Sequence, residues 1–234
     1  MKVPERGKVG PVTPLTALGG TPISVWVERN SDAIVQRLGE HIALTATALG
    51  IGLAASIALS VLSLRFRWSY PVILGVAGAL YVIPSLGAFA VLAPFSGLSF
   101  TTAVIPLATY TLLILIRNVV TGVDQVPAEV RESAIGMGFT RSRLLWQVEL
   151  PLALPVVIAG LRVAAVTTIG LVTVTSLLGY GGLGYFILRG IQTPVPQPAP
   201  IIVGIVLSVV LAVVVDLVLW LTGRALTPWT RKAR

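Results

Sequence analysis

The sequence predicts an all-α integral membrane protein of about five transmembrane helices, with a helical cytoplasmic loop between the third and the fourth. Of its 234 residues, 55% are hydrophobic and only 11% are charged, whereas a soluble domain carries about 25% charged residues. Five apolar runs reach the roughly 20 residues that a bilayer crossing needs. One polar stretch, Glu132–Pro151, interrupts these runs and must lie in water.

Composition also excludes several other classes of protein. The chain has no cysteine and one histidine, so disulfides, thiol chemistry, cysteine-based zinc sites and a catalytic triad lack their residues. The net charge of +8 comes from basic residues at the ends of apolar runs rather than from one basic patch, so a nucleic-acid partner is not expected. The first ten residues contain no apolar core, which argues against a cleavable signal peptide.

The first element is an N-terminal arm. Residues 1–30 are expected to be flexible, because 1–24 are rich in Gly, Pro and Thr. Residues 31–40 place Ile34, Val35 and Leu38 on one face, which predicts a short interfacial helix leading into the first span. A solvated lead-in that only anchors the chain is the alternative.

The transmembrane domain is expected to cover 41–223. Small residues recur in its spans and allow helix backbones to approach closely, so we expect a packed bundle. Prolines at 84, 106 and 155 predict kinks. The five expected spans are 42–64, 71–93, 101–121, 152–178 and 200–222.

Basic residues predict the orientation of the chain in the membrane. One side would hold ten Lys and Arg residues, including those of the loop 124–151 and of the basic tail 224–234, and the other side six. The short loops agree, because 94–100 has no basic residue and 179–199 has one. We therefore expect the loop and the C-terminus in the cytoplasm and the N-terminus outside.

The polar loop 124–151 is itself patterned as two helices. A proline at 127 followed by an acidic residue predicts a helix from about 127 to 137. Gly138 is the residue type expected where the chain turns past a helix end. Thr140 can cap a second helix over 141–150, and Pro151 marks the passage into the fourth span.

The loop resembles the EAA motif of permease subunits of binding-protein-dependent ABC importers. That motif is Glu-Ala-Ala, three residues, Gly, nine residues and Ile-x-Leu-Pro; here it reads Glu132-Ser133-Ala134, Gly138 and Val148–Pro151, with every spacing kept. Ser133 and Val148 are departures, and both are small. The resemblance extends over about 41–190 in span number and spacing and does not cover 1–30.

This resemblance implies that the loop is a coupling helix seated in a cleft of a cytosolic ATPase subunit. Glu132 would be the polar anchor, Gly138 the turn and Ala134 a point of close packing. The alternative is an ordinary loop with solvated charges. The residues implied in ATPase coupling are Glu129, Glu132, Ser133, Ala134, Gly138, Leu150 and Pro151.

The resemblance also implies partners and a location. It predicts cytoplasmic ABC ATPase subunits, a second permease chain that is identical or homologous, an extracytoplasmic substrate-binding protein and membrane lipid. The chain itself would bind no cofactor and catalyse no reaction, because ATP and Mg²⁺ are used by the partner ATPase. Its expected location is the bacterial plasma membrane.

A finer similarity concerns the substrate. Local stretches at 41–45, 83–94, 116–123, 126–140 and 177–187 are similar to the osmoprotectant branch of these permeases, which takes up glycine betaine, carnitine, choline or proline betaine. An amino-acid importer such as a methionine permease is the nearest competitor. An ATP-independent channel or membrane scaffold, and an integral-membrane enzyme, are readings from other classes.

Several further residues invite a functional role. Tyr81, Phe89 and Tyr110 are candidates to line a substrate pathway, since aromatic rings attract quaternary ammonium groups; interfacial aromatic belts are the alternative. Gly179–Gly184 fits GxGxxG but follows a membrane span, which favours a glycine-rich helix break over a dinucleotide site.

Two charged residues fall inside the fourth and fifth expected spans. Arg162 is close enough to the cytosolic end of its span to reach the interface. Asp216 is expected to pair with a neighbouring helix or a partner chain rather than with substrate.

Overall fold

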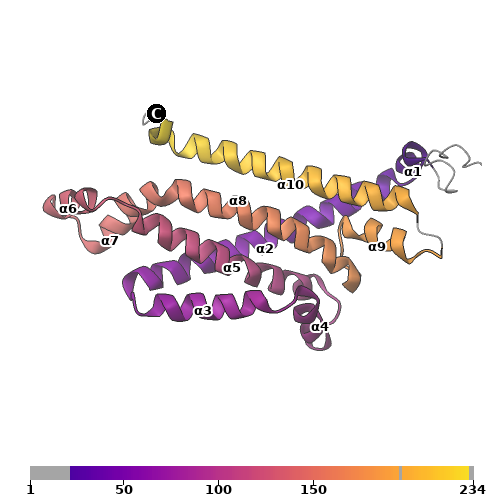
Figure 1. Ribbon diagram of the computed structural model, residues 1–234, viewed down its shortest axis with the longest axis horizontal. Helices are drawn as coiled ribbons and strands as arrows, with labels where there is room; N and C mark the ends of the chain where they lie inside the picture. The colour runs from indigo at the N-terminus through magenta and orange to yellow at the C-terminus, as the bar shows by residue number, and fades with distance from the viewer. Residues whose placement is uncertain (1–21, 195–196, 232–234) are drawn as a thin grey trace, which may run out of the picture.

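The computed structural model describes residues 22–194 and 197–231, and over these ranges the fold is a bundle of membrane helices (Figure 1). Four helical segments are long and apolar enough to cross a membrane, and a fifth crossing results if one sharply bent pair counts as a single span. The predicted all-α membrane fold is therefore confirmed. The four long helices are α2 (Ser31–Arg65), α5 (Phe100–Asp124), α8 (Leu150–Val174) and α10 (Pro198–Leu226).

Helix α5 is the centre of the bundle. It packs against α2 on one side and α8 on the other, while α10 packs against α8. Its apolar window is the most buried of the candidate spans. Side chains from α2, α5 and α8 form a buried core around Leu44, Leu107 and Val172.

Small residues on α2 allow its close approach to α5. The helix buries a residue at every fourth position, namely Ala48, Gly52, Ser56 and Ser60. A Cβ atom on Gly52 would collide with Thr111 of α5. In lipid, where apolar side chains gain little from leaving the solvent, such close backbone packing is a main source of helix association.

The N-terminal expectations need two corrections. Residues 31–40 form no separate interfacial helix, because they are the start of the continuous 35-residue helix α2; no proline interrupts the stretch, and the apolar run that follows propagates the helix. Part of the expected flexible arm is also helical. Helix α1 (Ile23–Arg29) places Trp26 edge-on against Phe186, with ring centroids 5.4 Å apart. Residues 1–21 lie outside the described part of the chain.

The second predicted span, 71–93, is not one straight helix. It divides into α3 (Ser69–Val82) and α4 (Ser85–Ser96), bent by 89° at the break. Pro84 is responsible, because it lacks the N–H that would bond the carbonyl of Leu80 and its ring clashes with the preceding turn. Prolines 106 and 155 instead lie within α5 and α8, which remain continuous.

The ends of the last two spans also differ from the prediction. Helix α8 begins at Leu150 and passes into a 3₁₀ turn, Thr175–Leu178. A further helix, α9 (Gly184–Gln192), lies in the connector to α10. Helix α10 continues into the predicted basic tail as far as Leu226, and a 3₁₀ turn covers Pro228–Arg231. Residues 195–196 and 232–234 lie outside the description.

The glycine-rich segment 179–184 is a packing element around His41. The buried imidazole donates from Nε2 to the carbonyl of Ile169 at 3.1 Å, and Nδ1 accepts from the N–H of Leu183 at 3.3 Å. Gly182 has φ +44°, and a Cβ there would lie 2.6 Å from the Cβ of His41. The predicted glycine-rich helix break is observed, and it joins α2, α8 and the start of α9 through one side chain.

We expect His41→Leu to destabilise the protein. The substitution keeps an apolar volume but leaves the buried N–H of Leu183 without its acceptor, which costs about 1–3 kcal/mol. For a chain of this size the melting temperature in detergent should fall by roughly 2–12 °C. The control is Thr45→Val, one turn along α2, because the buried Thr45 hydroxyl has no hydrogen bond within the described residues. Equal melting of His41→Leu and wild type would show that the histidine bonds contribute nothing.

Candidate functional site

The loop between α5 and α8 folds as a helical hairpin at one end of the bundle. It consists of α6 (Ala128–Gly136), α7 (Arg141–Leu144) and a π-helical turn, Leu145–Glu149, that runs directly into α8. The hairpin lies at the same end as the C-terminal end of α10, and α1 and α9 lie at the opposite end (Figure 1). The predicted sequence of helix, glycine turn and helix is observed, although the second helix changes to π geometry after Leu144.

The turn of the hairpin is a Schellman motif, and both hydrogen bonds that define this motif are present at the end of α6. The N–H of Phe139 donates to the carbonyl of Ala134 at 3.1 Å, and the N–H of Gly138 donates to the carbonyl of Ile135 at 2.9 Å. Gly138 has φ +85°, a conformation that side chains disfavour. Thr140 then caps α7, since its hydroxyl accepts from the N–H of Arg143 at 3.4 Å. Local bonds thus specify the whole turn.

Arg131 fastens the hairpin to the membrane helices. Its Nε donates to Glu149 at 2.7 Å, and its Nη2 donates to the carbonyl of Val123, near the end of α5, at 2.6 Å. Both side chains of the ion pair are largely buried. One guanidinium therefore ties α6 to the end of α5 and to the turn before α8. Sequence reasoning missed this pair, because its members are 18 residues apart and belong to no local pattern.

A second ion pair lies close by. Arg67, in the short turn between α2 and α3, contacts Asp124 at the end of α5 at 2.8 Å. Both side chains are about half exposed, so the contact contributes little to stability. It places the α2–α3 turn beside the root of the hairpin.

The residues predicted for coupling divide into an inner and an outer set. Ala134 is 2% exposed and packs inward. Leu150 and Pro151 begin α8 and are half-buried. Ser133 is exposed, and its hydroxyl donates to the carbonyl of Glu129 at 2.7 Å.

Glu129 and Glu132 face outward, one helical turn apart. Both are exposed, and within the described residues neither carboxylate makes an ion pair or a hydrogen bond. The hairpin also exposes large apolar side chains, and we define the hairpin surface by Val130, Ile135, Met137 and Trp146, with Met137 70% exposed. Apolar groups grouped with unpartnered acids outside the lipid are typical of a protein-binding surface.

The predicted pathway aromatics do not form one group. Phe89 is 0% exposed in the core beside Leu44 and Leu107, so the prediction that it lines a solute pathway is wrong for this chain. Tyr81 and Tyr110 do meet, with ring centroids 5.9 Å apart in an edge-to-face arrangement. The Tyr110 hydroxyl donates to the carbonyl of Ile83 at 2.6 Å. These two tyrosines thus lie together at the α3–α4 break.

The charged residues of α8 and α10 that lie inside these spans, Arg162 and Asp216, bind each other. Arg162 on α8 donates from Nε and Nη2 to the two carboxylate oxygens of Asp216 on α10, at 2.7 and 2.6 Å. The expected pairing of Asp216 with a neighbouring helix is confirmed, and Arg162 is its partner. A bidentate pair of this kind neutralises both charges where hydration is scarce.

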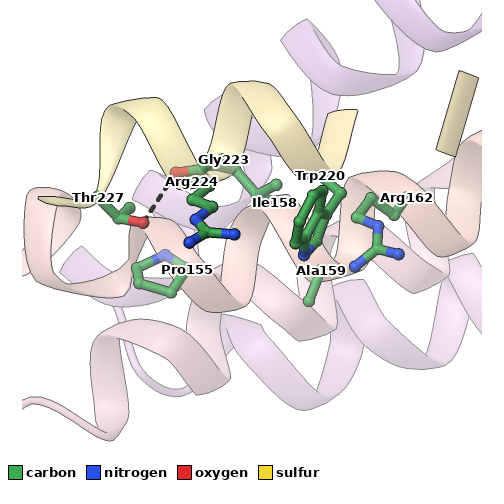
Figure 2. A pocket seen from close by; sticks show the side chains of 8 residues that line it. All are labelled: Pro155, Ile158, Ala159, Arg162, Trp220, Gly223, Arg224 and Thr227. Atoms are coloured by element: carbon green, nitrogen blue, oxygen red, sulfur yellow. Dashed lines mark hydrogen bonds between the residues drawn. The ribbon is translucent and has the colours of Figure 1, made fainter. Parts of the chain in front are cut away.

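A groove of about 220 Å³ continues from this pair between α8 and α10. Figure 2 shows Trp220 between Arg162 and Arg224, with Pro155 and Ala159 on the α8 side. Arg224 lies 5.4 Å from the centroid of the Trp220 ring. The groove is shallow and lined by groups already engaged with each other, so we regard it as part of the α8–α10 contact.

Taken together, these features define a multi-span membrane protein that carries a helical hairpin at one end of its bundle. Within the described residues no cluster of His, Asp or Glu suitable for a metal ion is present. Residues 46–227 match the model of the binding-protein-dependent transport system inner membrane component family, and the chain belongs to that family.

Curated relatives agree with this assignment. The chain is 37% identical over 158 residues to the osmoprotectant import permease protein OsmW of Salmonella typhimurium, covering 65% of this chain and 74% of that protein. It is 34% identical over 203 residues to the choline transport system permease protein OpuBB of Bacillus subtilis, covering 87% and 93%. It is 33% identical over 210 residues to the Bacillus subtilis glycine betaine/carnitine/choline permease OpuCD, covering 90% and 91%.

Solved structures show the same fold. A chain of the MetNI methionine ABC transporter in an inward-facing conformation superposes with a TM-score of 0.75, at 19% identity, over 88% of this chain and 99% of that one. A chain of an amino acid ABC transporter with histidines gives a TM-score of 0.73 at 17% identity, over 88% and 99%. At this level of identity the likeness shows the architecture alone.

We expect Gly138→Ala to loosen the hairpin and Gly136→Ala to leave it intact. A Cβ atom added at either position would meet no atom within 4 Å, so the two variants differ only in backbone conformation. The left-handed conformation of residue 138 costs an alanine about 1–2 kcal/mol, which corresponds to roughly fivefold to thirtyfold faster local opening. Hydrogen exchange of amides 128–139, followed by mass spectrometry, measures this. Equal exchange in the two variants would contradict the role of the turn.

Proposed function

We propose that this chain is the transmembrane permease subunit of an ABC importer for compatible solutes carrying a quaternary amine, such as glycine betaine, carnitine, choline or proline betaine. One observation carries the proposal. Relatives that are 32–37% identical over 65–90% of this chain are named as permeases for osmoprotectants, choline, carnitine or glycine betaine. The stretches compared include the loop 124–151 as well as the membrane helices.

In this proposal the α6–α7 hairpin docks in a cleft of a cytoplasmic ABC ATPase subunit. Its exposed apolar side chains would supply contact area, and Glu132 would pair with a basic or N–H group in the cleft. Arg131 ties the hairpin to α5 and to the turn before α8, so a push on the hairpin would move both spans as one body. ATP and Mg²⁺ would be bound by the ATPase and not by this chain.

A second permease chain, identical or homologous, would complete the solute pathway. The core of a single chain is filled by packed side chains, so a solute must pass along the surface of the bundle, between two chains. An extracytoplasmic binding protein would deliver the solute at the opposite end from the hairpin. Alternating access, driven by ATP, would then move the solute across the membrane.

The proposed orientation in the bacterial plasma membrane follows from the distribution of charge. The hairpin and the C-terminal end of α10 share one end of the bundle (Figure 1), and that end carries most of the basic residues. By the positive-inside rule it faces the cytoplasm. The N-terminus would lie outside.

Two alternatives remain for comparison. The structural likeness to methionine and amino-acid transporters supports an amino-acid importer only as far as the shared fold. An ATP-independent channel or scaffold would need no ATPase and would leave the exposed hairpin without a role.

The deciding experiment is solute uptake into liposomes that contain the chain with its ATPase and binding-protein partners. We expect ATP-dependent uptake of labelled glycine betaine, reduced by unlabelled choline or carnitine and unaffected by methionine. Competition by methionine alone would favour the amino-acid importer. Flux that persists without ATP would favour a channel.

We further expect Glu132→Arg to lower ATP-coupled uptake by about tenfold or more, because a reversed charge in a docking cleft repels the group that it should bind. Glu132→Gln, which keeps the shape, should have a smaller effect. Asp32→Arg is the control, since Asp32 is an exposed acid at the start of α2, at the far end of the bundle. Undiminished coupled uptake by Glu132→Arg, at equal protein yield, would rule out the docking role.

A further inference from the structure

At the break between α3 and α4 the backbone is not helical, and this break lies near the middle of the membrane. Tyr110, which contacts the break, is the eleventh residue of the 25-residue helix α5, and therefore lies roughly 15 Å from the start of that helix. Non-helical backbone at this depth is tolerated only where protein covers it or where it lines a polar cavity. The Ile83 carbonyl meets this requirement through the Tyr110 hydroxyl.

A cavity of about 230 Å³ lies against this break. This is somewhat smaller than the pockets that hold drug-sized ligands, so it suits a smaller solute. No charged side chain lines it. Its walls include Tyr81, Pro84, Ser85, Tyr110, Thr167 and Leu171.

The two tyrosines have different roles at this cavity. Tyr110 is 5% exposed, and its hydroxyl is engaged with Ile83, so it is a fixed part of the wall. Tyr81 is 38% exposed and rests edge-to-face against the Tyr110 ring. Tyr81 therefore offers the cavity an aromatic surface that a rigid neighbour holds in place.

Polar groups without partners complete the lining. The hydroxyls of Ser85 and Thr167 line the same cavity, and neither makes a hydrogen bond within the described residues. They come from α4 and α8, on different sides of the break. One cavity thus combines an aromatic ring with two hydrogen-bonding groups and carries no net charge.

We propose that this cavity is a transit site for a quaternary ammonium solute, with the trimethylammonium group against Tyr81 and the carboxylate or hydroxyl end bonded to Ser85 and Thr167. This inference rests on the proposed function. An aromatic face attracts such a cation most strongly where water is excluded. The absence of charged groups keeps the affinity low, which a site that must release its solute requires.

A second cavity at the break has a different lining, which supports assigning the solute to the cavity at Tyr81. It has about 270 Å³ and lies on the other side of Ile83 and Tyr110, which line both cavities. Its remaining lining is apolar except for Thr109, whose hydroxyl is already bonded to the carbonyl of Ile105 at 2.8 Å. That cavity suits a lipid chain, whereas the cavity at Tyr81 has the free polar groups that a solute needs.

The test is solute binding to the permease–ATPase complex in lipid nanodiscs, without the binding protein. The probes are glycine betaine and 3,3-dimethylbutanoate, its isostere with carbon in place of the ammonium nitrogen. Wild type should prefer glycine betaine. Tyr81→Leu should weaken glycine betaine binding by about threefold to thirtyfold, and Tyr81→Phe should change it less than twofold because the ring remains. Binding of the isostere should be the same in all three proteins.

Matched controls separate a site effect from damage to the fold. Tyr180→Leu removes a tyrosine of similar exposure outside the cavity, and it should bind glycine betaine as wild type does. The Tyr180→Leu complex should also hydrolyse ATP at the basal rate of wild type. Equal affinity of wild type for both probes, or unchanged betaine binding in Tyr81→Leu, would overturn the transit site.

Transport by the complete system distinguishes this inference from the proposed function. If the wild-type complex with its binding protein imports no quaternary amine, the proposed function fails and the transit site fails with it. If wild type imports glycine betaine and Tyr81→Leu imports it equally fast at every concentration, only the transit site fails. A selective loss in Tyr81→Leu, rescued by Tyr81→Phe, supports both.

Discussion

The hydrogen-bonding requirement of a backbone inside lipid governs this structure. No water is available there to satisfy an exposed N–H or carbonyl, so the chain crosses as helices and must compensate wherever a helix stops. The two interior interruptions are compensated by side chains from other elements. Tyr110 donates to the Ile83 carbonyl at the α3–α4 break, and His41 accepts from Leu183 at the glycine-rich turn before α9. Each compensation also joins distant parts of the chain, so the same bonds that satisfy the backbone assemble the bundle.

The same scarcity of water explains how the chain places its charges. The charges of Arg162 and Asp216 are tolerated within the spans because the two side chains neutralise each other through two hydrogen bonds. Arg131 and Glu149 follow the same rule at the root of the hairpin. Glu129 and Glu132, by contrast, have no partner within the described residues and lie on the exposed hairpin. The paired charges join separate helices, whereas the two hairpin acids remain exposed on the surface that is proposed to dock.

The sequence predicted whatever depends on local pattern. Apolar runs located the spans, and Pro127, Gly138 and Thr140 located the hairpin and its turn, because propensity and capping act over a few residues. The sequence predicted less well the features that depend on contacts between residues far apart along the chain. A kink was expected at Pro84, but nothing in the sequence indicated that the Ile83 carbonyl beside it bonds Tyr110, 27 residues further on. The position of His41 gave no hint that it bonds residues 128 and 142 positions away. The short helix expected at 31–40 was wrong because an amphipathic lead-in and an apolar span can share one uninterrupted helix.

Helix α5 connects the two places where function is proposed. At the end nearest the hairpin, the Val123 carbonyl of α5 accepts from Arg131, and near the middle of α5 Tyr110 bonds the α3–α4 break. Helix α8 makes a parallel connection, since it continues from the hairpin through the π-helical turn and carries Thr167 into the cavity at Tyr81. In the proposed function, a movement of the hairpin would therefore displace α5 and α8, which form two walls of that cavity, relative to α3 and α4. Under that proposal, the packing between α5, α8 and the broken helix would link the docking of an ATPase to access to the cavity.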